Sequence, residues 1–312
     1  MLSAPLPSIA QPQKVWRVGF MGVDGPADFG RRLDAFRDGL RDLGYLEGKN
    51  ILIEFRWADG KTDRLPALAA ELVRLNVDVI VCYGTPGTRA AKQATSTIPI
   101  VSARSGDLVG NGLVSSLARP GGNVTGSTFF SEELMVKRLE LLKEAMPRVA
   151  TVGVVINPDN QSNPRDFKAV VAAGSTVKVV ARQFEARARE QIGDAFSAMT
   201  KSRVQAALIF DDSIFVAQAV EIAEHANRTR LPAIGTREFA EAGGLMGYDA
   251  NRLEAWRRAA VFIDKIFKGA KPGDLPIERA TRFELTVNRK TANTFGIKIP
   301  NSILVRADKV IE

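Results

Sequence analysis

Val15-Trp16-Arg17-Val18-Gly19-Phe20-Met21-Gly22 begins the pattern that determines the fold. This apolar run predicts a buried strand, and the apolar residues that follow recur at helical spacing between Leu33 and Leu43. Gly44 ends the helix predicted over residues 29–43. A strand followed by an amphipathic helix is the unit from which open parallel sheets are built.

The same alternation continues along the chain. Strands and helices are predicted in turn at 51–55, 65–75, 77–82, 88–94 and 98–101. A turn-rich segment at 118–123 then precedes a helix that we expect Ser131 to cap and Pro147 to end. After it the pattern restarts, with strands at 151–156, 177–184, 206–210 and 231–234. Short connections between strands and helices predict an α/β protein with two parallel sheets, each covered on both faces.

Size and charge narrow the class of protein. A chain of 312 residues is long for one domain and suits two. Its formal charge of +8 comes from basic residues interspersed with acids, as in Arg252-Leu253-Glu254, which is typical of solvated helix faces. No nucleic-acid-binding motif is present, and we expect no nucleic acid as a partner.

Few residues are suited to catalysis or metal binding. Cys82 is the only cysteine and lies in an apolar run, so we expect a small buried hydrophobe. His225 is the only histidine, and its setting predicts a solvated helix residue. Neither a zinc site nor a histidine-based triad is indicated. With no P-loop and no dinucleotide fingerprint, the sequence predicts no enzyme, no catalytic residue, no cofactor and no metal.

The first 13 residues differ from the rest. They are rich in proline and small residues, and Ser8-Ile9-Ala10 resembles a cleavage pattern, although a charged n-region and a long apolar h-region are absent. We interpret residues 1–13 as a leader or signal-peptide remnant, which is compatible with export to the periplasm. No apolar stretch reaches the ~18 residues of a membrane span, so we expect a soluble mature chain.

In an open parallel sheet, ligands bind outside the carboxyl ends of the strands. In the first half these ends carry Asp24, the segment Tyr83-Gly84-Thr85-Pro86, and Ala103-Arg104-Ser105. The free N–H groups of a helix that follows Gly84 and Thr85 can hold a carboxylate or phosphate, with the Thr85 hydroxyl as a further donor. A turn that merely caps the helix fits the spacing equally well.

In the second half the strand ends carry Asn157, Asp211 and Asp212, and Arg237 and Glu238. Adjacent strand residues point to opposite sides, so Asp211 and Asp212 are not expected to share a substrate. We expect one to face the cleft and the other to cap the helix near Ser213. Arg237 and Glu238 either recognise a zwitterion together or pair with each other at the surface.

Residues 112–126, Gly-Leu-Val-Ser-Ser-Leu-Ala-Arg-Pro-Gly-Gly-Asn-Val-Thr-Gly, also carry a resemblance. They resemble the signature of the ABC-transporter substrate-binding proteins of the tryptophan/tyrosine-binding type, and residues 137–143, 237–246 and 306–312 agree with it. The resemblance implies the type I periplasmic-binding fold, with two Rossmann-like lobes joined by three crossover segments near 125–129, 247–250 and 282–285. Lobe 1 would comprise 14–126 plus 249–283, and lobe 2 would comprise 127–248 plus 284–312.

The resemblance also implies roles for residues. Thr85 and the segment Ala103-Arg104-Ser105 occupy the places that hold a ligand carboxylate in related receptors. Asp212 and Glu238 are the candidates for meeting its ammonium group. Two stretches depart from the family pattern, Val23-Asp24-Gly25-Pro26 and Leu245-Met246-Gly247-Tyr248-Asp249, and both are expected near the ligand side chain.

The function implied is a receptor that traps a small molecule, an amino acid or aromatic acid, by hinge closure and delivers it to an ABC permease in the membrane. We expect a monomer. The first alternative is a ligand-sensing module for signalling or regulation with the same fold, and the second is an α/β enzyme. No helix-turn-helix precedes residue 14, which counts against DNA binding by this chain.

Overall fold

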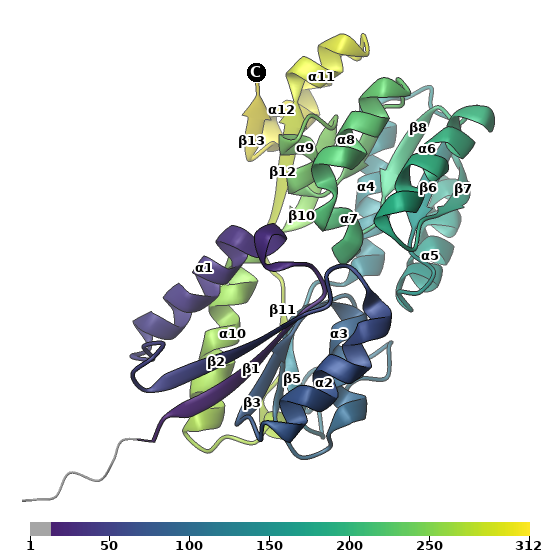
Figure 1. The fold of residues 1–312 in the computed structure, drawn as a ribbon. Coiled ribbons are helices and arrows are strands. Elements are labelled where there is room, and N and C mark those ends of the chain that lie inside the picture. The colour runs from purple at the N-terminus through teal and green to yellow at the C-terminus, as the bar shows by residue number, and fades with distance from the viewer. Residues whose placement is uncertain (1–13) are drawn as a thin grey trace, which may run out of the picture.

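The computed structural model describes residues 14–312, which form two lobes that meet at a narrow waist (Figure 1). The predicted leader at 1–13 lies outside the described residues. Each lobe is built on one sheet with helices on both faces, so the predicted α/β architecture is confirmed. The two sheets have the strand orders β2-β1-β3-β4-β5-β11 and β7-β6-β8-β9-β10-β12-β13.

All strand pairs of the first sheet are parallel. Its strands are β1 (Trp16–Gly22), β2 (Ile51–Trp57), β3 (Val79–Cys82), β4 (Ile100–Ser105), β5 (Val124–Thr128) and β11 (Glu278–Arg279). Its helices are α1 (Pro26–Asp42), α2 (Leu65–Arg74), α3 (Gly84–Ala94) and α10 (Arg252–Phe267). Helices α1 and α10 pack together on one face and α2 and α3 on the other (Figure 1).

Aromatic packing joins α10 to the first sheet. Trp256 of α10 is only 2% exposed, and its ring lies 5.4 Å from that of Phe20 on β1 and 4.8 Å from that of Phe29 on α1. Tyr83, directly after β3, contacts the same tryptophan at 5.5 Å. Because aromatic side chains bury large apolar areas, this cluster holds the C-terminal helix and the strand ends of lobe 1 in one rigid unit.

The second sheet contains one reversed pair of strands. Its strands are β6 (Thr151–Ile156), β7 (Val180–Glu185), β8 (Ala206–Ile209), β9 (Ala233–Gly235), β10 (Met246–Ala250), β12 (Phe283–Asn288) and β13 (Lys309–Ile311). Strands β10 and β12 are antiparallel, whereas the sequence predicted a wholly parallel sheet. The chain leaves this lobe after β10 and returns along β12, so the two neighbours run in opposite directions.

Two apolar layers hold the second lobe together. Val152, Val154 and Ile156 of β6 belong to the layer beside α4 (Ser131–Ala145) and α5 (Asn163–Thr176), whereas Val155 belongs to the layer on the other face. This is the alternation expected of a strand buried on both sides. The remaining helices are α6 (Ile192–Lys201), α7 (Ser213–Ala217), α8 (Ala219–Arg228), α9 (Arg237–Glu241), α11 (Arg289–Thr294) and α12 (Asn301–Arg306).

The chain passes between the two sheets three times, at residues 129–130, at 251 and at 280–282. These connections coincide closely with the three crossovers that the resemblance implied. We propose the expected boundaries near 126, 249 and 283 as the places where the lobes hinge.

Three local expectations need correction. Ser131 does not cap α4, because the chain enters that helix through Phe130 in a left-handed turn, and the Ser131 hydroxyl donates instead to Asp166 at 3.0 Å. Helix α3 begins at Gly84 rather than near residue 88, since the φ of +69° at Gly84 turns the chain directly after β3. His225 is half-buried rather than solvated, with its ring stacked on Phe196.

Cys82 is buried, as the sequence predicted, and burial raises the pKa of its thiol to about 12. None of the helices formed by residues 14–312 combines the length and apolar character needed to cross a membrane.

Candidate ligand-binding cleft

Two neighbouring spaces lie between the lobes. The first, the main cleft, is lined from lobe 1 by Arg32, Tyr83, Gly84, Thr85, Pro86, Arg104, Gly106, Arg252 and Trp256, and from the first crossover and lobe 2 by Phe129, Ser131, Asn160, Ser162, Asp211, Asp212, Ser213 and Val216. The second, the side cleft, is lined mainly by residues 29–32, 216–217, 237–241 and 249–253. Arg32, Val216 and Arg252 line both, so the two spaces adjoin.

The end of β3 supplies the lobe 1 wall of the main cleft. Thr85 is buried, and its hydroxyl oxygen lies 3.3 Å from that of Ser105. The Tyr83 hydroxyl donates to Asp24 at 2.6 Å, and Asp24 also accepts from Arg32 at 3.5 Å. Asp24 therefore orients Tyr83 from behind the wall. Burial and the neighbouring Asp24 carboxylate raise the pKa of Tyr83 well above its ordinary value, which keeps the phenol protonated.

On lobe 2, Asp212 caps α7. It accepts from the backbone N–H of Ile214 at 3.0 Å and from the Asn160 amide at 2.8 Å, and Asn157 approaches both of its oxygens at 3.4 Å. Burial raises the pKa of Asp212, although these donors oppose the shift. The Asp212 carboxylate thus lines the cleft with hydrogen-bond donors already on both oxygens.

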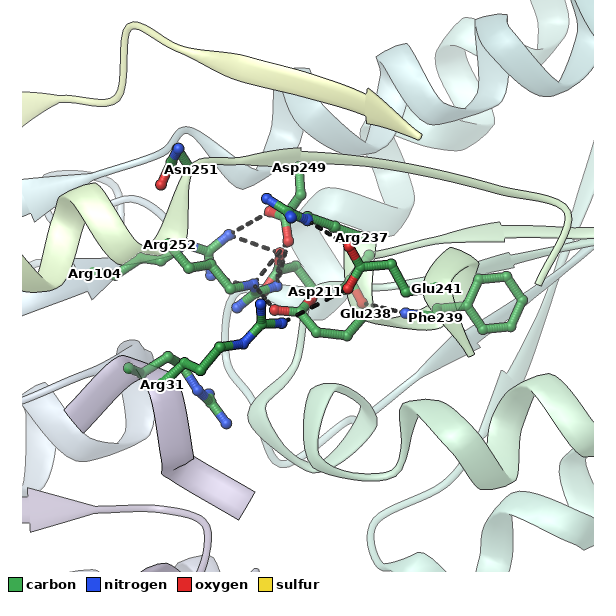
Figure 2. A network of polar contacts seen from close by, with 12 residues as sticks. Arg31, Arg104, Asp211, Arg237, Glu238, Phe239, Glu241, Asp249, Asn251 and Arg252 are labelled. Carbon is green, nitrogen blue, oxygen red and sulfur yellow. Dashed lines mark hydrogen bonds and ion pairs between the residues drawn. The ribbon is translucent and has the colours of Figure 1, made fainter. Parts of the chain in front are cut away.

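Asp211 also lines the main cleft, because β8 ends at Ile209 and strand alternation does not extend to residues 211 and 212. Asp211 joins a buried ion network that spans the lobes (Figure 2). Arg104 on β4 donates to the two oxygens of Asp211 at 3.0 and 2.8 Å, and to Asp249 on β10 at 2.8 Å. Arg252 at the start of α10 donates to Asp249 at 2.8 Å and to Asp211 at 3.1 Å. Two arginines of lobe 1 are therefore bound to two aspartates of lobe 2.

The charges in this network compensate one another. Burial alone would raise the pKa of Asp211, but the guanidinium groups of Arg104 and Arg252 outweigh it and hold that pKa well below its usual range. Arg138 on α4 is fully buried behind them, donates to the carbonyls of Tyr248 and Ile209 at 2.8 Å, and lies 3.7 Å from Asp211. Burial raises the pKa of Asp249, and the guanidinium groups of Arg252 and Arg104 oppose that shift. A buried ion network of this kind persists because each charged group has an oppositely charged partner.

Arg237 and Glu238 do not pair with each other. Arg237 donates to Glu241 at 2.9 Å and to Glu284 at 3.0 Å. Glu238 lies 3.5 Å from Arg252, and its Oε2 is buried with no hydrogen-bond donor among the described residues. Burial disfavours the charge of Glu238, yet Arg252 and Arg32 outweigh burial and lower its pKa, so the side cleft contains a carboxylate at neutral pH.

The lobes are closed on each other. The hydroxyl oxygens of Thr85 and Ser162 are 2.9 Å apart, and Arg165 of lobe 2 donates to Asp107 of lobe 1 at 2.8 Å. The main cleft retains about 40 Å³ and the side cleft about 170 Å³. A single water needs at least about 10–15 Å³, so the main cleft has room for a few waters only. A larger ligand can enter only when the lobes separate.

The predicted site residues fall into two groups. Tyr83, Gly84, Thr85, Pro86 and Asp212 line the main cleft, and Arg237 and Glu238 line the side cleft. Asp24, Ala103, Ser105 and Asn157 are buried behind these walls, and Tyr248 stacks on Phe283 within lobe 2.

Sequence reasoning missed the ion network and its neighbours. Arg104 belongs to the predicted strand-end segment Ala103-Arg104-Ser105, but no neighbouring residue in the sequence indicates that it binds Asp211. Asp249 and Arg252 sit at a crossover, where no periodicity applies. Arg32 and Ser162, which also line the main cleft, follow strand ends only after several intervening residues. Within residues 14–312, no group of three or more His, Cys, Asp or Glu side chains is placed to hold a metal ion.

Known proteins resemble this chain over nearly its whole length. The Tyrosine-binding protein of Clostridioides difficile is 28% identical over 269 residues, which cover 84% of this chain and 76% of that protein. An ABC domain in complex with L-Trp from Streptococcus pneumoniae has a TM-score of 0.88 at 24% identity, covering 96% of this chain and 100% of that one.

The ligand-free, open structure of a substrate-binding protein from Clostridium difficile matches less well, with a TM-score of 0.66 at 22% identity over 95% of this chain and 99% of that one.

The family model described as ABC transporter substrate binding protein matches residues 22–311. That match includes every strand except most of β1, all three crossovers and the residues that line both clefts. The proteins of this family bind solutes and are not enzymes. With two lobes closed over a small polar cleft, the chain belongs to the ABC transporter substrate-binding protein family.

Proposed function

We propose that this protein is the exported, periplasmic receptor of an ABC importer and that it captures an aromatic amino acid between its lobes. The observation that carries the proposal is a charge-balanced cleft with aromatic side chains in its wall. Tyr83, Phe129 and Trp256 line the main cleft and offer rings on which an aromatic side chain can pack. A relative that is 28% identical is named Tyrosine-binding protein, which supports the same ligand class.

The balance of charge favours a zwitterion. Arg104, Arg138 and Arg252 face the carboxylates of Asp211, Asp249 and Glu238. A ligand with a net charge would leave one buried charge without compensation when the lobes close, and an uncompensated buried charge is costly. An amino acid brings one charge of each sign and leaves the balance unchanged.

We propose that the ligand carboxylate binds at the start of α3. The first-turn N–H groups of a helix have no partner within the helix, and the positive end of its dipole favours an anion. The Thr85 hydroxyl lies at this end and faces the cleft. This is the role that the sequence suggested for Thr85.

The two residues that the sequence suggested as acceptors of the ligand ammonium group, Asp212 and Glu238, differ in their hydrogen-bond partners. Asp212 already accepts from Asn160 and Ile214, whereas Glu238 has a buried oxygen that lacks a donor. We propose Glu238 as the acceptor of the ammonium group because an unsatisfied carboxylate oxygen gains most from a new charged donor. Asp212 then acts mainly as the cap of α7.

Closure follows from contacts between lobes. The ligand binds to one open lobe, and contacts from the other lobe then stabilise the closed form. Thr85 with Ser162, and Arg104 with Asp211, are the contacts that closure adds. We propose that the closed monomer docks on the membrane permease of the importer.

Isothermal titration with L-tyrosine, L-tryptophan and L-phenylalanine tests the proposal, with tyramine and 4-hydroxyphenylacetate as analogues that lack one charged group. We expect binding of at least one L-amino acid and at least about tenfold weaker binding of both analogues, since each leaves buried charge unpaired. Mass spectrometry should recover the ligand unchanged. Tight binding of tyramine or turnover of the ligand contradicts the proposal.

Matched variants test the residue roles. Glu238→Gln removes the carboxylate charge with little change of shape, and we expect the affinity to fall by roughly tenfold or more. Asp212→Asn keeps a side chain that caps helices well, so a smaller loss is expected. The reverse order of effects would assign the ammonium to Asp212. If Glu238→Gln, Asp212→Asn and Thr85→Ala all bound the ligand as tightly as the parent protein, the proposed site would be wrong.

A further inference from the structure

A third space lies behind the cleft, at the hinge. This hinge cavity has a volume of about 360 Å³, larger than either cleft. Its lining comes from all three connections between the lobes and from the first turns of α10, and comprises Arg104, Ser127, Thr128, Phe129, Ala250, Asn251, Glu254, Ala255, Arg258, Glu278, Arg279, Ala280, Thr281 and Arg282. In this closed conformation the main cleft has little free volume, but the hinge cavity is still large enough to hold a compound with one ring.

Arg104 and Phe129 separate this cavity from the main cleft. The Arg104 guanidinium lies 3.7 Å from the centre of the Phe129 ring, and both residues line the two spaces. The same guanidinium is bound to Asp211 and Asp249 on its other side. The hinge cavity is therefore a separate space that shares one rigid wall with the ligand cleft.

The floor of the hinge cavity is apolar and its rim is basic. Phe129 and Ala250 are buried at the floor, while Ala255 and Ala280 are small enough to leave room above them. Four arginines and two glutamates stand among its lining residues. An apolar body can bury its surface on the floor while an anionic group remains at the rim.

Arg279 is the rim cation best placed to meet an anion. Arg258 is paired with Glu278, and Arg282 lies 3.4 Å from Glu284. Arg279 instead stacks over the Phe130 ring at 4.0 Å, and no carboxylate partner for it occurs among the described residues. Its guanidinium is thus held in position by an aromatic ring and keeps its donors for an external acceptor.

We propose that the hinge cavity is a second small-molecule site, which takes a monoanion with a compact apolar ring, of the aromatic carboxylate class. The ring rests on Phe129 and Ala250, and the carboxylate meets Arg279 at the rim. This site is separate from the proposed amino-acid site and does not depend on it.

The position of the cavity couples it to lobe movement. All three connections form its walls, so its shape changes whenever the lobes rotate about them. A ligand that fits the cavity in the closed form favours closure, and by linkage the cleft ligand raises the affinity of the hinge cavity by the same factor.

Benzoate is a suitable probe, with benzamide as the neutral analogue. Ligand-observed NMR titrations on the full chain measure binding in the parent, in Arg279→Glu and in Ala280→Trp, whose indole fills the cavity. Arg148→Glu is the matched control, because Arg148 is exposed, lies outside the hinge and has no hydrogen-bonded or ion-paired side-chain partner among residues 14–312. Circular dichroism verifies that each variant is folded.

We expect benzoate to bind the parent and Arg148→Glu alike. Arg279→Glu should weaken it by about threefold or more, the effect of one exposed charge pair reversed in sign. Ala280→Trp should abolish it, and benzamide should bind more weakly than benzoate.

Three results would overturn the proposal. The first is absence of benzoate binding to the parent, and the second is equal binding by the parent and Arg279→Glu. The third is an apparent benzoate Kd that rises without limit as a cleft ligand is added. Such a rise indicates that the two ligands compete for the cleft, because coupling between separate sites changes the Kd only up to a plateau. Failure of amino-acid binding leaves the first two readouts intact, so the two proposals can fail independently.

Discussion

The hydroxyl oxygens of Thr85 and Ser162 lie 2.9 Å apart and join the start of α3 in lobe 1 to the segment before α5 in lobe 2. Ser162 also accepts from the Asn111 amide of lobe 1 at 3.0 Å. One buried side chain therefore holds two elements of the opposite lobe, and it does so only while the lobes are closed.

Ser162→Ala should weaken ligand binding by roughly tenfold, because a net hydrogen bond contributes about 1 kcal/mol and two partners lose their acceptor or donor. The loss should appear as faster dissociation in stopped-flow measurements, since the contact forms after the ligand has bound. Ser197→Ala, which removes an exposed hydroxyl bonded within α6, is the control. Unchanged dissociation from the Ser162 variant contradicts a role in closure.

Arg104→Gln should shift the protein toward the open form. It leaves Asp249 paired with Arg252, and Asp211 paired with Arg252 and the more distant Arg138. Removing one partner of a buried ion network costs about 3–5 kcal/mol. Opening the lobes lets water reach these carboxylates, so the cost falls on the closed form rather than on folding. Small-angle X-ray scattering should show a larger radius of gyration for this variant, with or without ligand.

Arg187→Gln is the comparison for Arg104→Gln, since Arg187 forms an exposed ion pair with Glu185. Surface pairs contribute little, so its scattering should match that of the parent. A closed Arg104→Gln protein would show that the network is not needed for closure.

Asp166 makes stability depend on pH. Burial raises its pKa from 3.8 to about 7, partly opposed by the hydrogen bond from Ser131. A folded-state pKa above the unfolded value means that the folded state binds the proton more tightly. The contribution of Asp166 is therefore most favourable below about pH 4, and is lost as the pH rises to about 7.

Asp166→Asn should remove this slope and stabilise the protein more at about pH 8 than at about pH 5, by at most about 1.4 kcal/mol per pH unit between them. Urea unfolding at both pH values measures the difference. Asp194→Asn, at an exposed position on α6, should change neither. An equal effect of Asp166→Asn at the two pH values would contradict the shifted titration.

Trp256 should report ligand binding. It is one of three tryptophans, is 2% exposed and lines the main cleft, so an aromatic ligand alters its surroundings directly. L-Phenylalanine, which does not share the emission of tryptophan, should change the fluorescence of the parent and of Trp16→Phe and Trp57→Phe. The response should disappear in Trp256→Phe, and its persistence there would place the ligand elsewhere.

Much of the fold followed from local patterns. The apolar run before Gly22 and the helical spacing up to Leu43 predicted the first strand and helix, and the same alternation predicted both sheets. Strand-end reasoning then found Tyr83, Thr85 and Glu238 in the clefts, because the carboxyl ends of parallel strands meet at one edge.

The same reasoning did not reach the partners of the strand-end residues. It expected only one of Asp211 and Asp212 to face the cleft, whereas both line it, and it expected Tyr248 near the ligand, whereas that side chain stacks on Phe283 and lines neither cleft. Alternation along a strand tells which residues point apart, but the surrounding helices and the other lobe decide what each of them meets.

The sequence by itself therefore determined the elements, their order and the edges where a ligand binds, since these depend on periodicity within a few residues. Only the tertiary structure decided that β10 and β12 run antiparallel, that three connections enclose a hinge cavity, and that Arg104 binds Asp211. Those two residues are 107 positions apart in different lobes, and their attraction acts only after both lobes have folded and closed. No sequence pattern near either residue indicates that the two will be in contact.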